Sequence, residues 1–331
     1  MLKKSPKVSF IVPVLNEEKM INKCLDSILN LDYPREKIEI LIAKGPSMDK
    51  TSKILTKYLT KSDNIKIIDN PSGNTAIGRN ICITHSTGEM IMNYSGHAIA
   101  EKNLLKVLAI TLQKSPPDIA AVGCSNVNPE NPNFIAAVSG IAFSSFLGGK
   151  NLFVQNAEFD SERFIDHISF ACYRKKYLEK VGNFDPDFWC GQDAELDLRL
   201  LKAGYKILYT PDTKVLHYKR NTIGSLFKQM YRYGIARAKM AKKHPGTLCF
   251  FHLIGSCFVI GGILLLLLTI LKFIPLWLPF LLLIAYFLAS IISSSMVTKK
   301  PVYIITSILF YFLIHVGYGL GIIRGFFPVK L

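Results

Sequence analysis

The sequence is short of acidic residues. Against 40 Lys and Arg residues there are only 24 Asp and Glu, which gives a formal net charge of +16 at pH 7. This basic excess fits partners that carry phosphate, such as a nucleotide, a lipid phosphate or an anionic membrane surface. No nucleic-acid-binding motif is recognisable, so nucleic acid is not expected as a partner.

Closely spaced cysteines are also missing. The seven cysteines are scattered along the 331 residues, without the spacing of a zinc site or of a disulfide framework. We therefore expect reduced thiols. We also expect no signal peptide, because Met1 to Lys7 leads directly into a strand-like apolar run.

The N-terminal part of the chain alternates short apolar runs with helical patterns. The runs typical of buried strands are Val8–Val12, Ile38–Lys44, Ile65–Asp69 and Glu89–Ser95. Helical patterns separate them, the last at Thr75–Ser86. This alternation predicts an α/β fold with a mainly parallel sheet and right-handed crossovers. Ligands of such sheets bind beyond the carboxyl ends of the strands.

Acidic residues cluster in one segment that follows a turn of Gly and Pro. Within Trp189–Leu200, Asp193, Glu195 and Asp197 stand at the start of a helical pattern. A carboxylate in the first turn stays ionised beside the positive end of the helix dipole, and catalytic residues are often found at such loop junctions. A structural alternative has equal weight: Asp193 and Glu195 cap the helix, with a salt bridge to Arg199.

This segment resembles a known family. GQDAELDLRL, from Gly191, followed by AGYKI, is similar to the G-x-D-x-E and Arg segment of family-2 inverting glycosyltransferases, nucleotide-sugar enzymes of the GT-A fold. The resemblance covers roughly residues 7–245 and includes membrane-anchored enzymes of exopolysaccharide and lipid-linked oligosaccharide synthesis, of the succinoglycan type. It implies that Asp193 is the catalytic base. Gln192 replaces the usual acid and is expected beside the acceptor or the diphosphate.

The strand ends carry further motifs of the same resemblance. They are VSFIVPVLNEE, similar to the first strand and donor loop, IAKGPSMDKT, similar to V-D-G-G-S-x-D-G-T, and GRNICITHSTGE, similar to the A-R-N segment. The donor-binding residues that the resemblance implies are Pro13, Leu15, Asn16, Glu17, Lys44, Ser47, Asp49, Arg79, Asn80 and Ser95. Lys44 stands where an acid usually reads the base. Arg79 suits a diphosphate, because guanidinium binds phosphate oxygens in a bidentate way.

The fourth strand end departs from the family's metal motif. The family has D-x-D, whose carboxylates hold Mg²⁺ or Mn²⁺ against the diphosphate. Here Ser95-Gly96-His97 occupies the position, and some exopolysaccharide relatives carry D-A-H. The resemblance implies a divalent cation, Mn²⁺ or Mg²⁺, near His97 and His217, and imidazole suits Mn²⁺ better. Alternatively, His97 bonds a phosphate or is simply exposed to water.

Two segments before the C-terminal region are apolar or amphipathic. Phe134–Gly149 is too short to span a bilayer, so it is either a buried helix or lies at the membrane face near a lipid-linked acceptor. Residues 221–245 form a basic amphipathic pattern. In it, Gln229, Arg232 and Tyr233 resemble the family's Q-x-x-R-W acceptor motif. The alternative is a juxtamembrane helix whose basic residues meet anionic lipid.

The chain from Phe250 onward is almost free of charge. Apolar stretches long enough to cross a bilayer are expected at about residues 250–271, 275–292 and 302–323. By the positive-inside rule, the basic residues before the first stretch and at 299–300 place the catalytic domain in the cytoplasm, with Lys272 and the C-terminus outside. The predicted domains are a GT-A domain at 1–220, a basic interface helix at 221–246 and a membrane domain at 247–331.

These features together predict an inverting glycosyltransferase anchored in the cell membrane and in contact with its lipids. It would move a sugar from a nucleotide sugar to a polyprenyl-linked saccharide in polysaccharide or glycan assembly, with Asp193 as base. Two alternatives stay open. One is a polyprenyl-phosphate sugar synthase, whose anionic acceptor needs no base. The other is a catalytically inactive membrane binding protein of the same fold, suggested by Lys44, Ser95 and Gln192.

Overall fold

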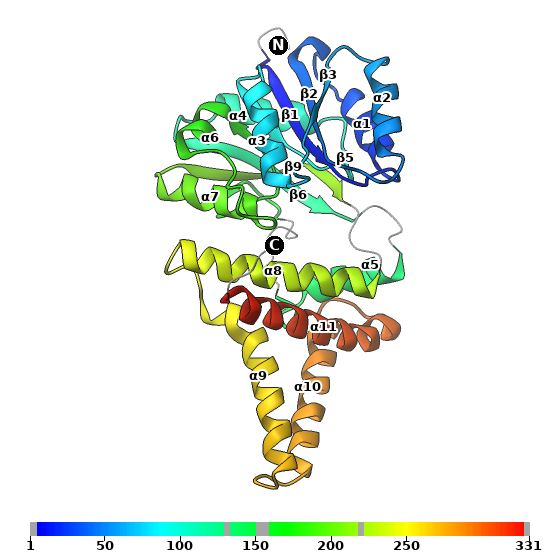
Figure 1. The fold of residues 1–331 in the computed structure, drawn as a ribbon, viewed down its shortest axis with the longest axis vertical. Helices are drawn as coiled ribbons and strands as arrows, with labels where there is room; N and C mark the ends of the chain where they lie inside the picture. The colour runs from blue at the N-terminus through cyan, green and yellow to red at the C-terminus, as the bar shows by residue number, and fades with distance from the viewer. Residues whose placement is uncertain (1–4, 129–132, 150–158, 218–221, 328–331) are drawn as a thin grey trace. The chain divides into compact units, whose positions relative to one another are not determined.

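The computed structural model describes residues 5–128, 133–149, 159–217 and 222–327. The chain divides into two compact units (Figure 1). Residues 1–129 and 158–218 form the first, which we call the sheet unit, and residues 130–157 and 219–331 form the second, the helical unit. The helical unit is therefore built from two separate parts of the chain.

The sheet unit contains one mixed sheet. Its strands are β1 (Val8–Val14), β2 (Ile38–Lys44), β3 (Ile65–Asp69), β4 (Met90–Asn93), β5 (Ala98–Ala100), β6 (Ile119–Val127), β7 (Arg163–Phe164), β8 (Phe170–Arg174) and β9 (Lys206–His217). The order is β3-β2-β1-β4-β8-β6-β9-β5, with β7 beside β9. The first four strands in the chain are parallel, and β8 runs antiparallel between β4 and β6. The predicted α/β class is confirmed.

Helices cover both faces of this sheet. They are α1 (Ile21–Leu29), α2 (Thr51–Leu59), α3 (Thr75–His85), α4 (Leu104–Lys114), α6 (Lys175–Val181) and α7 (Gln192–Lys202), with a 3₁₀ turn, η2, at Arg35–Lys37. Side chains of β1 alternate between two cores: Val8, Phe10 and Val12 pack with α1, α2 and α4, whereas Ile11 packs with α3, α6 and α7. Burial on both faces explains why the strands read as continuous apolar runs.

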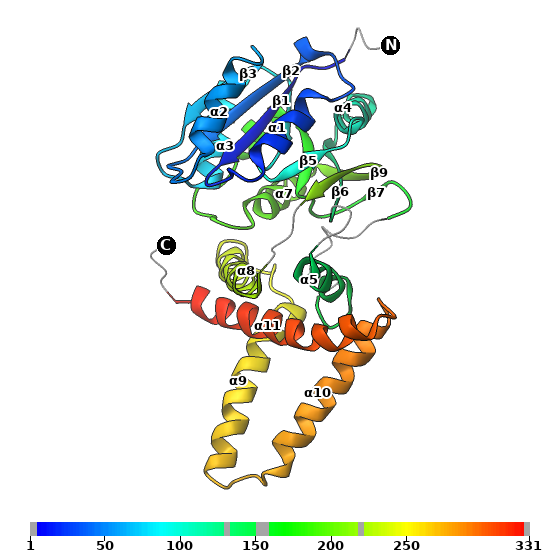
Figure 2. The same cartoon turned by 90° about the vertical axis from the view of Figure 1, so that its right-hand side faces the viewer.

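The helical unit consists of α5 (Phe134–Ser144), α8 (Ile223–Lys243), α9 (Phe250–Ile270), α10 (Trp277–Ser295) and α11 (Pro301–Gly325). By length and apolar composition, α9, α10 and α11 are each able to cross a membrane. Figures 1 and 2 show α8 and α11 side by side, with α9 and α10 extending away from them as a pair. α5 packs on α11, where the rings of Phe134 and Tyr303 lie 5.6 Å apart. α5 thus belongs to the helical unit, although it falls within the predicted 1–220 domain.

Candidate active site

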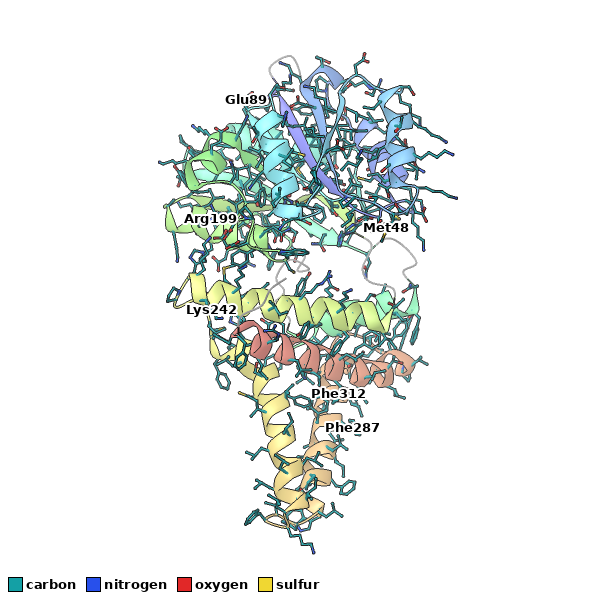
Figure 3. All side chains as sticks on the ribbon, in the orientation of Figure 1. Met48, Glu89, Arg199, Lys242, Phe287 and Phe312 are labelled. Atoms are coloured by element: carbon teal, nitrogen blue, oxygen red, sulfur yellow. The ribbon has the colours of Figure 1, made fainter. Side chains whose placement is uncertain are left out.

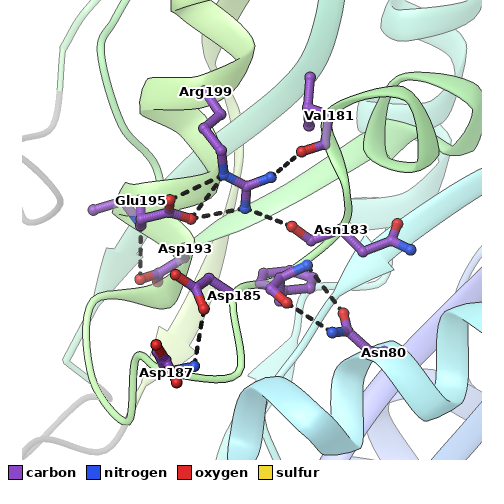
Figure 4. A network of polar contacts seen from close by, with 10 residues as sticks. Asn80, Val181, Asn183, Asp185, Asp187, Asp193, Glu195 and Arg199 are labelled. Carbon is purple, nitrogen blue, oxygen red and sulfur yellow. Dashed lines mark hydrogen bonds and ion pairs between the residues drawn. The ribbon is translucent and has the colours of Figure 1, made fainter. Parts of the chain in front are cut away.

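The loop that leads into α7 is fixed by an ion pair. Asn183 and Gly191 adopt positive φ angles of 57° and 70°, which bend the loop sharply. Arg199 Nη2 lies 2.7 Å from Glu195 Oε2 and donates to the carbonyl of Asn183 at 2.5 Å, and Nη1 donates to the carbonyl of Val181 (Figure 4). The expected pair between Glu195 and Arg199 is therefore present, and it holds the loop against the helix.

Asp197 is bound into the core. Its side chain is 0% exposed and accepts hydrogen bonds from Tyr173 Oη at 2.8 Å and from the backbone N–H of Ile168 at 3.1 Å. His167 Nδ1 lies 2.7 Å from the same carboxylate. Burial raises the pKa of Asp197, and the hydrogen bond with His167 opposes that rise. These contacts give Asp197 a structural role.

Asp193 differs from the other two carboxylates of α7. It lies in the first turn, and its Oδ1 accepts the backbone N–H of Ala194 at 3.0 Å. Gly191 occupies the N-cap position, so neither Asp193 nor Glu195 caps the helix as the structural alternative required. Within the described part of the chain, Asp193 forms no hydrogen bond or ion pair with a side chain. Asp193 thus lies at the positive end of the α7 dipole.

Arg79 of α3 is a buried cation near Asp193. Its side chain is 8% exposed, and its guanidinium lies 5.0 Å from the centre of the Phe184 ring. Burial lowers the pKa of Arg79, and the charge of Asp193 opposes this. In the described residues its Nε and Nη1 are buried without a hydrogen-bond partner. Because buried N–H groups are almost always bonded, Arg79 is suited to receive an anion.

Two asparagines of the α3 region hold the loop before α7. Asn80 Nδ2 donates to the carbonyl of Phe184 at 2.7 Å, and the N–H of Phe184 donates to Asn80 Oδ1 at 3.0 Å (Figure 4). Asn74 caps α3 by accepting the N–H of Ala76, and its Nδ2 donates to the carbonyl of Pro186 at 2.9 Å. Asn80 thus holds the loop before α7 in place. The sequence analysis missed Asn74, although its place directly before a helical pattern was an N-cap signal.

The loops after β1 and β2 are tied together by the predicted donor residues. The N–H of Asn16 donates to Ser47 Oγ at 3.0 Å, and the N–H of Glu18 donates to Asp49 Oδ2 at 3.1 Å. Asp49 Oδ1 accepts the N–H of Thr51 at 3.0 Å. Desolvation alone would raise the pKa of Asp49, but the hydrogen bonds from Thr51 and Glu18 hold it below its usual value. These side chains fix the shape of the two loops.

Lys44 has an acidic partner on the next strand. Its Nζ, at the end of β2, lies 2.9 Å from Asp69 Oδ1 at the end of β3. The two side chains are 33% and 75% exposed, so both are accessible. Pro13 pairs with Ala43 inside the sheet, and Leu15 is 41% exposed just beyond β1. An acid thus stands beside Lys44 at this sheet edge, but it comes from Asp69, which the sequence analysis did not name.

The end of β4 brings Ser95, His97 and His217 together. Ser95 Oγ lies 3.2 Å from ring nitrogens of His97, and the rings of His97 and His217 lie 4.9 Å apart. Glu17 joins this group, because its Oε1 lies 2.7 Å from His97 Nδ1. Glu17 comes from the loop after β1, so it supplies a carboxylate that the Ser95–His97 segment lacks. The side chains of Glu17 and His97 are 22% and 28% exposed.

The remaining predicted site residues lie on two helices. Gln192 at the start of α7 is 7% exposed, and its Oε1 is buried without a hydrogen-bond partner among the described residues. Gln229 and Tyr233 lie one turn apart on α8, where Gln229 Nε2 donates to Tyr233 Oη at 3.0 Å. Arg232 is an exposed residue of the same helix. These α8 residues belong to the helical unit.

Comparison with known proteins identifies the family. The chain matches the model of glycosyl transferase family 2 over residues 9–182 and that of glycosyl transferase family group 2 over residues 101–316. It is also 32% identical, over 96% of its length and 98% of the relative's, to the dolichyl N-acetyl-alpha-D-glucosaminyl phosphate 3-beta-D-2,3-diacetamido-2,3-dideoxy-beta-D-glucuronosyltransferase of Methanococcus voltae. The chain belongs to glycosyltransferase family 2. Succinoglycan biosynthesis protein ExoA of Rhizobium meliloti is 27% identical to this glycosyltransferase, over 71% of this chain and 70% of that protein.

Solved structures show the same fold. The mannosyltransferase PcManGT from Pyrobaculum calidifontis, in complex with GDP-Man and Mn²⁺, is similar with a TM-score of 0.67 and 18% identity, over 97% of this chain and 87% of that chain. GalNAc-T7 with UDP, GalNAc and Mn²⁺ has a TM-score of 0.53 and 14% identity, over 66% of this chain and 44% of that one. The likeness confirms the GT-A type of fold that the sequence resemblance implied.

The side chains at the end of β4 include two possible metal ligands, Glu17 and His97. Among the described residues, no group of three or more His, Cys, Asp or Glu side chains is arranged to hold a metal by itself. Cations of nucleotide enzymes commonly need only one or two protein ligands, because phosphate oxygens supply others. Glu17 and His97 provide one carboxylate and one imidazole 2.7 Å apart. This pair fits a cation that binds together with a diphosphate.

Proposed function

We propose that this glycosyltransferase moves a sugar, with inversion, from a nucleotide sugar to a polyprenyl-linked saccharide during glycan or polysaccharide assembly. We propose the cytoplasmic face of the cell membrane as its place of action. The Methanococcus voltae relative is named for a dolichyl-linked acceptor and matches nearly the whole chain. The apolar helices α9 to α11 support action at a membrane.

One observation carries the proposed mechanism: of the three carboxylates of α7, Asp193 is the one that the fold does not use in a side-chain contact among the described residues. Glu195 is bonded to Arg199, and Asp197 is bonded into the core. In the proposed step, the acceptor hydroxyl attacks the anomeric carbon from the face opposite the diphosphate. The bond from that carbon to the phosphate oxygen breaks, a glycosidic bond forms, and the hydroxyl proton passes to Asp193. The nucleoside diphosphate leaves with the electron pair.

Arg79 is proposed to offset negative charge in this step. Its Nε and Nη1 are buried and lack a partner in the described residues, so a diphosphate oxygen admitted beside them would supply the missing acceptors. The phenyl ring of Phe184 fixes the guanidinium plane, and Asn80 in turn fixes Phe184. Glu17 and His97 would hold a divalent cation, Mn²⁺ in preference to Mg²⁺, with His217 beside them. When bound, such a cation offsets the charge of the diphosphate.

The other predicted residues are proposed to position the substrates. Residues of the loops after β1 and β2 and of the ends of β1, β2 and β4 are assigned to the nucleotide: Pro13, Leu15, Asn16, Lys44, Ser47, Asp49 and Ser95. Gln192, with its buried Oε1, is assigned to the acceptor or the diphosphate. Gln229, Arg232 and Tyr233 are assigned to the acceptor. Membrane lipids surround that acceptor, and the basic residues of α8 suit anionic headgroups.

Substitution of Asp193 tests the mechanism. We expect Asp193→Asn to lower turnover by about 10²–10⁴ while donor binding persists, because the amide cannot accept the proton. Asp187→Asn is the matched control, since Asp187 is an exposed carboxylate of the preceding loop. Membranes containing either variant would be incubated with a panel of labelled nucleotide sugars, and label would be followed into the lipid fraction.

Two outcomes of that assay separate the hypotheses. Loss of transfer in Asp193→Asn alone supports a hydroxyl acceptor and a catalytic base. Near-normal turnover in Asp193→Asn would contradict the role of Asp193. Together with label on a lipid phosphate, it would favour the polyprenyl-phosphate sugar synthase, whose acceptor is already an anion.

A further inference from the structure

The three long apolar helices of the helical unit differ in how much of their surface is covered. In the most apolar 18-residue stretch of each helix, 11% of the residues of α9 and 17% of those of α10 are buried, against 50% of those of α11. α9 and α10 expose large apolar side chains all around, including Ile260, Leu264 and Phe287. In Figures 1 and 2, α11 runs crosswise to α9 and α10. A helix that crosses the bilayer beside them would be expected to run along them.

The C-terminal half of α11 is packed closely against α8. A Cβ on Gly317 would meet the carbonyl oxygen of Phe227 at 3.2 Å, one on Gly321 would collide with that of Tyr231, and one on Gly325 would lie 2.7 Å from Ala238 Cβ. At the end of the seam, Lys242 Nζ donates to the carbonyl of Phe326 at 2.9 Å. The contacts advance in the same order along both helices, so the two run parallel and in close backbone contact. The two helices must therefore lie at the same depth in a membrane.

The charge of α8 decides where this pair of helices lies. Ile223–Lys243 contains no Asp or Glu, and its basic residues are Lys228, Arg232, Arg237, Lys239, Lys242 and Lys243. If α11 crossed the bilayer, α8 would be carried into it. The glycine contacts place Lys228 and Arg232 beside α11, whereas Lys239, Lys242 and Lys243 lie beyond its end. Each Lys or Arg near the centre of a bilayer costs about 2.5–3.5 kcal/mol, so Lys228 and Arg232 together would cost up to about 5–7 kcal/mol. The same residues are favourable at an anionic membrane surface.

The uncovered side of α11 is an apolar stripe. Its residues are Val302, Ile305, Leu309, Phe312 and Leu320, each between 37% and 66% exposed. Their spacing of three, four or eight residues places them on one helix face. The opposite face, with Ser307, Tyr311 and Gly321, is buried in the unit. Figure 3 shows Phe312 on the side of α11 from which α10 and its Phe287 extend.

We propose that only α9 and α10 cross the bilayer, as a hairpin, and that α11 lies in the membrane surface with its apolar stripe in contact with lipid. At 1.5 Å per residue, the 21 residues of α9 and the 19 of α10 span about 31 Å and 28 Å, which matches a hydrocarbon core of about 30 Å. Lys272, with φ of 62°, ends α9 at the far side. Two spans replace the three expected from hydropathy, and the C-terminus lies on the same side of the bilayer as α8.

The length of chain between β9 and α8 decides on which side of the bilayer the sheet unit lies. β9 ends at His217 and α8 begins at Ile223, and the few residues between them reach at most about 3.6 Å each. They cannot cross a bilayer, so the sheet unit and α8 share one side. This inference does not depend on which reaction the enzyme catalyses.

Labelling from one side of the membrane tests the topology. The full-length protein would carry Cys190→Ser, Cys249→Ser and Cys257→Ser and keep its four buried cysteines. One new cysteine would then be added at a time: Asp63→Cys, Lys272→Cys, Lys299→Cys, or a cysteine after Leu331. A membrane-impermeant maleimide would then be added to oriented vesicles. We expect the cysteines at 63, 299 and the C-terminus to react from one side and the cysteine at 272 from the other. If the maleimide labelled the C-terminal cysteine from the same side of the membrane as the cysteine at 272, the proposal would be overturned. Reaction of all four from one side would also overturn it.

A depth measurement tests the orientation of α11 directly. Nitroxide labels at Ile305, Phe312 and Leu320 would be compared by their accessibility to oxygen and to a water-soluble nickel chelate in vesicles containing anionic lipid. If α11 lies in the surface, the three labels share one depth. If it spans, Ile305 and Leu320 are separated by about 22 Å along the bilayer normal, and Phe312 is the deepest. Labels at Phe251, Ile260 and Ile270 of α9 are the matched control and should show that gradient.

Discussion

The start of α7 and the strand end at Ser95–His97 are built in opposite ways. On α7, Glu195 and Asp197 are 0% exposed. Glu195 is bonded to Arg199, which holds the loop, and Asp197 is bonded to Tyr173 of the sheet, so the fold itself sets the position of Asp193. At the strand end, His97 is partly exposed and is held mainly by Glu17. The segment that keeps the family motif also builds the fold. The segment that departs from it is the one where, in the proposed function, bound substrate supplies the missing charge.

The largest expected effect comes from breaking the ion pair of α7. Glu195→Ala should lower the free energy of unfolding by about 3 kcal/mol, because it leaves Arg199, whose side chain is 18% exposed, without its carboxylate. Thermal unfolding in detergent measures this loss. The double variant Glu195→Leu with Arg199→Met should recover much of it, since it leaves no unpaired charge.

A second pair with the same spacing provides the control. Lys175 and Glu179 also lie four residues apart, at 3.7 Å, but Glu179 is 53% exposed. Glu179→Ala should therefore change the free energy of unfolding by less than about 1 kcal/mol. Equal losses in Glu195→Ala and Glu179→Ala would mean that burial does not distinguish the two pairs.

A smaller effect is expected at the strand end. Excess chelator should reduce transfer, and Glu17→Gln should raise the Mn²⁺ concentration needed for half-maximal activity about tenfold, because the pair with His97 loses its negative charge. Ser95→Asp should act in the opposite direction and improve the use of Mg²⁺. Full activity in chelator would mean that Arg79 and other basic groups stabilise the leaving diphosphate without a metal.

The smallest effect is expected from the loop carboxylate Asp49. Its pKa is lowered in the folded protein, so its contribution to stability is complete above its unfolded pKa and is lost only as pH falls through the lowered value. Asp49 is therefore ionised throughout pH 6 to pH 8, and its hydrogen bonds to the donor loops are present over the whole range. Asp49→Asn weakens these bonds by about 1 kcal/mol, so it should raise the donor KM about fivefold, equally at every pH in the range. Steady-state kinetics across that range measure it. A KM difference that varied across this range would contradict the assignment.

The sequence predicted those parts of the site that depend on local spacing. The pair between Glu195 and Arg199 follows from residues one turn apart, and β1 to β4 follow from apolar runs that are buried on both faces. Other contacts join distant segments: Glu17 and His97 are 80 residues apart, and Asn80 and Phe184 are 104 apart. Their partners meet only because the sheet aligns the strand ends, which no local pattern encodes.

Hydropathy likewise predicted how long the apolar helices are, but not which helices they pack against. The 25 residues of α11 are long and apolar enough to cross a membrane. Its glycines, however, fit against Phe227 and Tyr231 of α8, a helix with no acidic residue. The apolar stretch at Phe134 likewise gave no sign that it pairs with α11 rather than with the sheet.

The division of the helical unit between two stretches of chain has a consequence for synthesis. A ribosome completes α5 long before it reaches α11, and α5 and the loop after it need later residues: Phe134 stacks near Tyr303, and the N–H of Leu147 donates to Ser293 Oγ at 3.0 Å. The sheet unit ends at residue 218, so it is finished while α5 still lacks its cover. Until Pro301–Gly325 emerges, the apolar side of α5 needs a chaperone or the membrane surface itself. Chains released before that point should therefore aggregate or adhere to membranes.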